Sequence, residues 1–419
     1  MKPMGPIPQA FAAQTGMLVI AGKTVEQWAD IAGDTPFFIY DFAMVAARIT
    51  RLRAALPVGV GIHYAVKANP FAPLIRAIAP MIDGLDIASA GELSLVSTEA
   101  PGKPVSFAGP GKRDDELAAA ISAGVTINLE SEGETRRALA IGEKLGVAPR
   151  LAVRVNPSFE LRGSGMRMGG RASPFGVDAE AVPGLVAMII ANGAEWRGLH
   201  IFAGSQTLNT GAIIEMQAAT LALAGELADS IGAAPPLVNL GGGFGIPYFP
   251  GDEPVDVEAI GIALNDGLAS KSNALAQTSF VVELGRWLVG DCGVYLTRVV
   301  DRKVSRGETF LITDGGLHHQ LAASGNFGTV VKRNYPVAVA GLMGATAVET
   351  ATIVGCLCTP LDRLADQVEL PVATAGDLIA IFMAGAYGLS ASPTAFLGHA
   401  LPTELLAGLR DNPNAIFTS

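Results

Sequence analysis

Charged residues, cysteine and histidine are scarce in this chain, and each scarcity excludes a class of function. Only 16% of the 419 residues are charged and the formal net charge is −10, so the basic surface that nucleic acid requires is missing. The three cysteines, Cys292, Cys356 and Cys358, show neither a disulfide framework nor metal spacing. They indicate a reducing compartment, and we expect the cytoplasm. Among five histidines only His318 and His319 are adjacent, which gives no spaced ligand set and predicts no metal site.

Long apolar runs are also lacking. Uncharged stretches such as 336–348 are short and broken by glycine, so we expect no membrane-spanning segment. Residues 1–6 lack the charged-then-apolar layout of a signal peptide. Half of the residues are nonetheless apolar, which supports a large core and leaves apolar surface for an oligomer interface.

Short apolar strands alternate with helical patterns through the first two thirds of the chain. Eight strands with helices between them predict an α/β fold, a (β/α)8 barrel, and a doubly wound open sheet is the structural alternative. The expected strands are 58–66, 85–88, 105–108, 125–129, 151–155, 198–202, 237–240 and 280–284. A further strand over 37–41, followed by a helix near 43–56, precedes them.

The pattern changes after Gly285, where strand-like runs are joined by glycine-rich connections with almost no helical period. These runs, at 294–304, 310–313, 337–339, 352–354 and 378–381, predict a mainly β domain. We therefore expect an N-terminal segment, 1–36, that packs with the β domain, a barrel over 37–285, and a C-terminal β domain over 286–419. The irregular stretch 161–176 is long enough to be an active-site loop.

Lys67 stands at the end of the first expected barrel strand, in the run His63-Tyr64-Ala65-Val66-Lys67-Ala68-Asn69. A lysine held there points into the cavity above the sheet. If it is desolvated and its pKa is lowered, its amine can form a Schiff base with a carbonyl cofactor. A phosphate-binding or rim lysine is the alternative, because such strand-end lysines are common.

Two further strand ends carry groups that complement such a lysine. The run Gly241-Gly242-Gly243-Phe244 follows the seventh strand, where barrels favour phosphate sites, although a glycine run can also be only a tight turn. Glu283 and Arg286 follow the eighth strand. They could form a plain ion pair, or the guanidinium could meet a phosphate and the carboxylate a protonated ring nitrogen. Lysine, phosphate cradle and acid together describe a site for pyridoxal 5′-phosphate.

In these motifs the chain resembles the fold-type III pyridoxal-phosphate-dependent decarboxylases, the diaminopimelate and ornithine decarboxylase group. The likeness continues in order through 86–93, 153–157, 283–286, 314–316, 358–362 and 385–388. The sequence of residues 316–328 most resembles the pyridoxal-dependent decarboxylases associated with the exosortase A system. The resemblance implies an alanine-racemase-like barrel, decarboxylation of an amino acid through a Lys67 Schiff base, and a homodimer with shared active sites.

The resemblance also implies residue roles. Lys67 would hold the cofactor, Glu283 would keep its pyridine nitrogen protonated, and Cys358 of the partner subunit would protonate the α-carbon after decarboxylation. The alternative for Cys358 is a small buried residue without a catalytic role. The implied cofactor-binding residues are Lys67, Asp86, Arg154, His200, Phe202, Ser205, Gly241, Gly242, Gly243, Phe244, Glu283, Gly285, Arg286 and Tyr387. The implied substrate-binding residues are Thr359, Asp362, His318 and Asn326.

Three positions depart from the family pattern. Phe202 stands where a histidine normally stacks on the cofactor ring, and His200 lies two residues earlier, so it shares that face of the strand. Leu284 replaces a proline, which we expect to be neutral. Thr359 replaces the acidic residue that binds the distal amine of the substrate, and Asp362 is only a weak replacement.

The threonine at position 359, in place of an acidic residue, affects which substrate we expect. A pocket without a distal carboxylate disfavours plain ornithine or lysine. Diaminopimelate, an acyl- or citryl-modified amino acid, or one tethered to an acyl carrier protein remain open. Two other functions also remain open, an amino-acid racemase and a non-catalytic regulator. Glu283 and Cys358 both favour the decarboxylase over the racemase, and the presence of Lys67 disfavours the regulator.

Overall fold

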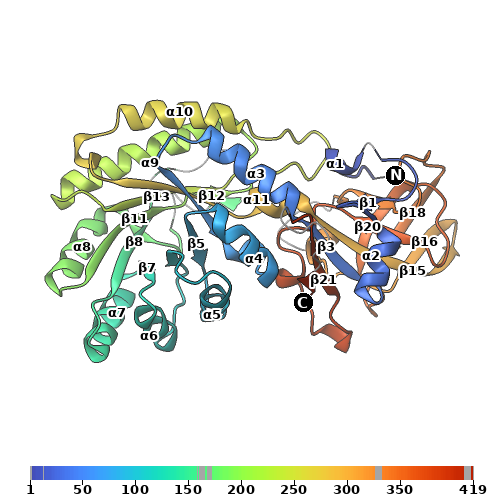
Figure 1. Ribbon diagram of the computed structural model, residues 1–419, viewed down its shortest axis with the longest axis horizontal. Coiled ribbons are helices and arrows are strands. Elements are labelled where there is room, and N and C mark those ends of the chain that lie inside the picture. The colour runs from blue at the N-terminus through green and yellow to red at the C-terminus, as the bar shows by residue number, and fades with distance from the viewer. Residues whose placement is uncertain are drawn as a thin grey trace.

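Two large sheets divide the molecule, a barrel covered by helices and a second sheet beside it (Figure 1). The computed structural model describes residues 2–12, 14–157, 159, 166–167, 172–325, 333–409 and 417–418. The expected loop 161–176 therefore lies mostly, and Asn326 entirely, outside the described residues.

Parallel strands form a closed barrel within the described residues. Each strand pairs in parallel with its neighbours, and the pairing of β7 with β8 closes the ring. The eight strands are β4 (Val60–Ala65), β5 (Gly84–Ile87), β6 (Val105–Phe107), β7 (Thr126–Leu129), β8 (Arg150–Asn156), β11 (Glu195–Ile201), β13 (Leu237–Gly242) and β14 (Ser279–Leu284). This confirms the predicted barrel and rules out the open sheet.

Helices on the outside of the barrel join these strands (Figure 1). They are α3 (Phe42–Ala55), α4 (Ala72–Ile78), α5 (Ala90–Glu99), α6 (Asp114–Ser122), α7 (Glu132–Leu145), α8 (Val182–Ala191), α9 (Thr210–Ile231) and α10 (Val257–Ala269). Several begin at a side-chain cap: Ser89, Ser131 and Asn209 each accept a backbone N–H of the following turn. Such caps end each βα loop sharply, so the strand ends and their side chains remain grouped on one face of the barrel.

The second sheet contains strands from both ends of the chain. It is built from β3 (Phe37–Asp41), β15 (Gly293–Ser305), β16 (Glu308–Thr313), β17 (Val337–Val339), β18 (Glu349–Val354), β19 (Arg363–Leu370), β20 (Leu378–Ile381), β21 (Thr403–Ala407) and β22 (Phe417–Thr418). The mainly β character predicted after Gly285 is thus present. The sequence patterns missed β19, β21 and β22.

Strand β3 belongs to this second sheet, although its residues fall within the segment predicted as the barrel. It pairs antiparallel with β15 and parallel with β21. Residues 37–40 are all buried, and a continuous apolar run does not reveal which sheet it joins. The domain boundaries at 36 and 285 stay a prediction, with this strand assigned to the second sheet.

The N-terminal segment packs against the second sheet. It contains α1 (Gln9–Ala12), β1 (Val19–Ile20), β2 (Lys23–Thr24) and α2 (Val25–Ala32). The backbone N–H of Leu18 donates to Ala340 at 2.7 Å, and Gly16 and Met343 exchange hydrogen bonds. An ion pair at 3.7 Å joins Glu26 of α2 to Arg298 of β15. Among the described residues, no helix combines the length and apolar character needed to cross a membrane.

Candidate active site

The lysine turn lies where the barrel meets the second domain. Lys67 is the middle residue of the 3-10 turn η1 (Val66–Ala68), which directly follows β4. The side-chain amide of Asn69 donates to the carbonyl oxygen of Gly385 at 3.0 Å. The backbone N–H of Tyr387 donates to the carbonyl oxygen of Ala68 at 2.8 Å. These bonds join residues more than 300 positions apart, so Lys67 and Tyr387 face the same space.

A cavity of about 710 Å³ opens at the carboxyl ends of the barrel strands. Its lining includes these predicted site residues: Lys67, Asp86, Arg154, Phe202, Ser205, Gly243, Phe244, Glu283, Gly285, Arg286 and Tyr387. Three predicted cofactor residues, His200, Gly241 and Gly242, lie behind this lining rather than in it. The cavity also includes Ala108, Gly109 and Phe175, which the sequence analysis did not name.

Lys67 faces an acid and an aromatic ring. Its Nζ lies 4.0 Å from Oε1 of Glu283 and 5.8 Å from the centre of the Phe202 ring. Burial lowers the pKa of Lys67, but the nearby groups Glu283, Tyr387 and Asp86 together outweigh it, and the pKa is raised above its ordinary value. The ammonium is the form that these residues stabilise.

Glu283 is held deep in the site by His200. Nε2 of His200 lies 2.9 Å from Oε2 of Glu283, and both side chains are buried. A carboxylate only accepts, so the imidazole donates. Burial raises the pKa of Glu283, but the His200 hydrogen bond and the charges of Lys67 and Arg154 lower it well below its ordinary value. Glu283 is thus an anion at physiological pH, which is what a protonated ring nitrogen would require as a partner.

The glycine run occupies space in which side chains do not fit. A Cβ on Gly242 would lie 2.1 Å from the carbonyl oxygen of Glu283, and one on Gly243 would lie 2.1 Å from that of Gly204. Gly241 and Gly243 also have positive φ angles of 68° and 71°. These glycines therefore let the backbone of β13 pass close to β14 and to the loop after β11.

Arg286 supplies positive charge at this end of the cavity. Its guanidinium lies 4.5 Å from the centre of the Tyr387 ring, and Nη1 donates to the hydroxyl of Tyr248 at 3.0 Å. Its Nε is buried and has no hydrogen-bond partner. A buried donor without an acceptor, beside Ser205 and the Gly243 backbone, fits a phosphate group.

Two polar networks hold Arg154 and Asp86, two further residues of the cavity lining. Nη1 of Arg154 donates to Oε1 of Glu130 at 2.9 Å, and its guanidinium lies 5.0 Å from the Phe175 ring. Asp86 lies 3.2 Å from Nδ1 of His63 and accepts from Ser106 at 2.5 Å. Burial lowers the pKa of His63, but the Asp86 carboxylate outweighs it, so the pKa is raised. Residues of the barrel thus fix the orientations of the Arg154 and Asp86 side chains.

The predicted substrate residues that the structure describes lie outside the cavity lining. Cys358 is exposed, and neither it nor Thr359 borders the cavity. Both oxygens of Asp362 accept backbone N–H groups, from Leu317 at 2.7 Å and Leu357 at 2.8 Å. Asp362 therefore joins two loops of the second domain, and its role in substrate binding stays a prediction, like that of Cys358.

His318 is a different case, because it is completely buried and both of its ring nitrogens lack a hydrogen-bond partner. Burial, with a smaller contribution from His399, lowers the pKa of His318 to about 4. The ring is therefore neutral at physiological pH, and its two nitrogens remain available.

Sequence reasoning missed Phe175 and His63 as parts of the site, whereas it groups Glu130 with the other polar strand ends. Phe175 follows a segment outside the described residues, and only its place in the long irregular loop pointed to it. Glu130 stands at the end of strand β7, and His63 lies inside the lysine motif. Its strand-end position predicts from the sequence that Glu130 belongs to the site, and its hydrogen bond with Arg154 agrees with this.

Comparisons with known proteins agree with this geometry. Residues 42–290 match the family model "Pyridoxal-dependent decarboxylase, pyridoxal binding domain". The chain is 36% identical over 380 residues to the L-glutamyl-[BtrI acyl-carrier protein] decarboxylase of Niallia circulans, covering 89% of this chain and 89% of that protein. It is 31% identical to the diaminopimelate decarboxylase of Archaeoglobus fulgidus, covering 90% and 89%. The crystal structure of Helicobacter pylori diaminopimelate decarboxylase with L-lysine superposes with a TM-score of 0.81 at 25% identity, covering 94% and 95%.

A barrel with a lysine, a buried acid and a phosphate cradle at its strand ends defines a pyridoxal-phosphate enzyme. The chain belongs to the pyridoxal-dependent decarboxylase family whose model covers its barrel. It is a pyridoxal-phosphate-dependent decarboxylase, and the racemase and regulator alternatives give way to this assignment.

The residues of this chain divide the work of the reaction. When bound, pyridoxal phosphate supplies an aldehyde and an electron-withdrawing ring that takes up the electron pair left by carbon dioxide. Lys67 would supply the amine for attachment, and Glu283 would stabilise positive charge at the ring nitrogen. Arg286 and the glycine backbone would bind the phosphate, and Phe202 would offer a flat apolar face against the ring. Each of these groups faces the same cavity.

Proposed function

We propose that this enzyme decarboxylates an amino acid whose distal end is covalently modified, with an amino acid tethered to an acyl carrier protein as the preferred form. The observation that carries the proposal is the residue after Cys358. A threonine stands there where the resemblance leads one to expect an acid that binds a distal amine. A neutral residue removes the charge that would compensate a buried ammonium group.

The surroundings of Thr359 support this reading. Asp362 is the carboxylate nearest in sequence, and both of its oxygens are already used by backbone N–H groups. Its side chain is buried, so a turn outward would leave those donors unpaired. The described residues of this loop thus offer no available carboxylate for a distal amine.

The relative from Niallia circulans supports the choice of a carrier. By its name it acts on a glutamyl group attached to an acyl carrier protein, and it is 36% identical to this chain. A tethered substrate presents an amide or thioester at its distal end, which requires neither a carboxylate nor a closed pocket. Acyl carrier protein is accordingly the proposed macromolecular partner, and the cytoplasm the proposed location.

We further propose a homodimer whose two subunits share each active site. Cys358 is exposed in the isolated chain and lies outside the cavity, so it needs a second chain to reach a substrate. Large apolar side chains near it are also exposed, namely Leu361, Phe396, Leu397 and Leu401. Exposed apolar residues on neighbouring loops are typical of a surface that a second subunit covers.

The experiment is a release assay for carbon dioxide with matched free and tethered substrates. We expect glutamyl-carrier protein, and carrier-bound amino acids in general, to turn over much faster than free glutamate, ornithine, lysine or diaminopimelate. High turnover on free ornithine or lysine would overturn the substrate proposal. A substrate-independent check is the visible absorbance of the bound cofactor, which Lys67→Ala should abolish together with activity.

A single substitution tests the role of residue 359. Thr359→Asp should raise kcat/KM for a free diamino acid by at least about tenfold, because it returns a charge partner for the distal amine. Thr359→Ser keeps the hydroxyl and adds no charge, so it serves as the matched control. If the Thr359→Asp and Thr359→Ser variants had the same kcat/KM on every substrate, residue 359 would not contribute to recognition of the distal end of the substrate.

A further inference from the structure

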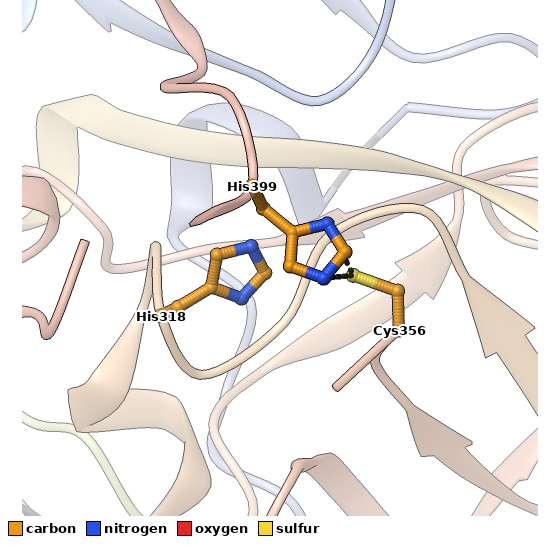
Figure 2. A group of neighbouring side chains, drawn as sticks. All are labelled: His318, Cys356 and His399. Carbon is orange, nitrogen blue, oxygen red and sulfur yellow. Dashed lines mark hydrogen bonds between the residues drawn. The ribbon is translucent and has the colours of Figure 1, made fainter. Parts of the chain in front are cut away.

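Three side chains that are far apart in the sequence converge in the second domain. His318, Cys356 and His399 each point one ligand atom into a common space, as Figure 2 shows, and these atoms lie within 4.8 Å of one another. His318 follows strand β16, Cys356 follows β18, and His399 lies on the segment before β21. We propose that these three residues bind a borderline-soft divalent cation, and that Zn²⁺ is the ion that they fit best.

The distances are close to those of a bound ion. Sγ of Cys356 lies 3.8 Å from Nδ1 and 3.9 Å from Nε2 of His399. Zinc bonds of about 2.3 Å to sulfur and 2.0–2.1 Å to nitrogen, in tetrahedral geometry, place these two atoms about 3.6 Å apart. A shift of a few tenths of an ångström would thus suffice for this pair, and the ligand atom of His318, which lies within 4.8 Å of the other two, would move closer as the ion binds.

His318 gives an independent reason to expect a ligand. Its side chain is fully buried, yet neither ring nitrogen has a hydrogen-bond partner. Buried polar groups are nearly always satisfied, and an unsatisfied one in a native fold points to an ion or water. The centre of its ring lies 5.1 Å from that of His399. A cation between them would satisfy the buried imidazole.

The neighbouring residues hold the loops that carry the ligands. Asp362 accepts from the backbone N–H of Leu317 and from that of Leu357, which are the residues next to His318 and Cys356. A Cβ on Gly316 would lie 2.4 Å from the Asp362 carboxylate, so a glycine is required for this approach. One buried carboxylate therefore sets the spacing of two ligands.

The third ligand is held in a similar way through His319. Its Nε2 donates to the carbonyl oxygen of Ala400 at 3.0 Å, and its Nδ1 lies 3.1 Å from the hydroxyl of Tyr295. Ala400 follows His399 directly, so this bond fixes the segment that carries the exposed imidazole. Because His319 uses both nitrogens in hydrogen bonds, it supports the site and is not a ligand.

The ligand chemistry selects the class of ion. Two imidazoles and one thiolate suit zinc, whereas magnesium and calcium prefer oxygen. As the Zn–S bond forms, the Cys356 thiol releases its proton to solvent. The exposed side of His399 leaves the fourth position to water. Bound metal would stiffen the segment between Cys356 and Cys358, which the resemblance assigns to the shared active site.

The test is a zinc titration of the full-length holoenzyme, without affinity tag, after removal of metals with a chelator. Calorimetry and elemental analysis should find one Zn²⁺ per chain with submicromolar affinity and release of a proton. Cys356→Ser and His399→Asn should each weaken binding by at least about 100-fold, since residues that only orient a ligand already contribute 10- to 100-fold. His399 is exposed, so its replacement leaves the core intact.

Cys358→Ser is the matched control, because it removes the more exposed thiol two positions away. It should leave the zinc affinity unchanged. Absence of submicromolar binding, or equal binding by the wild-type protein and both ligand variants, would overturn the site. A loss of binding in Cys358→Ser would show that the ligand set is wrong.

Discussion

Nε2 of His200 lies 2.9 Å from Oε2 of Glu283, and this buried contact joins strand β11 to strand β14 beneath the active-site cavity. Phe202, two residues after His200, lies at the level of the lysine, with its ring centre 5.8 Å from Nζ of Lys67. The same strand thus supplies an apolar face for the cofactor and a donor for the acid below it. We propose that His200 is a positioning residue that acts through Glu283.

Replacing His200 should change how Glu283 titrates. In His200→Leu the carboxylate loses a charge-assisted hydrogen bond, which is worth about 1.5–3 kcal/mol. The pKa of Glu283 should rise, and the acid limb of the kcat profile should move up by about one to two pH units. His200→Gln keeps a donor at this position and should recover part of the shift. A variant that lost activity equally at every pH would point to a merely structural role.

Removing the acid itself should affect chemistry more than binding. Glu283→Gln keeps the size of the side chain but removes the anion that stabilises positive charge at the ring nitrogen. We expect kcat to fall by about 10²–10³-fold, as for loss of other preorganised electrostatic groups. Cofactor content, measured by absorbance after denaturation, should remain near that of the wild-type protein. A small decrease in kcat at full occupancy would contradict the role assigned to Glu283.

The glycine run offers a test of packing. Gly242→Ala places a methyl group where only 2.1 Å separates it from the carbonyl oxygen of Glu283, so strands β13 and β14 must move apart. Such overpacking costs about 1–3 kcal/mol of stability and should also weaken cofactor binding. Gly111→Ala is the control, because an added Cβ there meets no atom within 4 Å. Equal melting temperatures for the two variants would exclude this explanation of the run.

The His63–Asp86 pair predicts a pH dependence of stability. The pKa of His63 is raised in the folded state by the Asp86 carboxylate, which outweighs burial. A raised pKa favours folding while the imidazole is protonated in both states, so this contribution is complete below the unfolded pKa of about 6.5. It is lost as the pH rises through the higher folded-state pKa. Denaturant unfolding at a series of pH values should show this decrease, and Asp86→Asn should remove it.

Mixing two inactive variants tests the shared site. Lys67→Ala and Cys358→Ala each disable one contribution, but a mixed dimer contains one site with both wild-type residues. If the active sites are shared in a two-fold dimer, random reassortment should restore about 25% of the wild-type sites. Each variant alone, taken through the same dissociation and mixing, is the control. No recovery in dimers shown to have exchanged subunits would assign both residues to one chain.

Much of this protein follows from local patterns in the chain. The eight barrel strands, the change to β structure after Gly285 and the groups at the strand ends all depend on short apolar runs and the residues that end them. In a parallel barrel such ends meet on one face by construction, which is why Lys67, Arg154, Glu283 and Arg286 could be grouped before their positions were known. The cavity contains all four.

Tertiary structure decided what depends on contacts between distant segments. It assigned residues 37–41 to the second sheet, placed Lys67 beside the Glu283 carboxylate, which raises the pKa of Lys67, and brought His200 into contact with Glu283. It also brought His318, Cys356 and His399 together, although their spacing showed no ligand pattern. Periodicity reports which face of an element is buried, but not which neighbour covers it. The neighbours of each side chain, and the charges that act on it, are determined only by the tertiary fold.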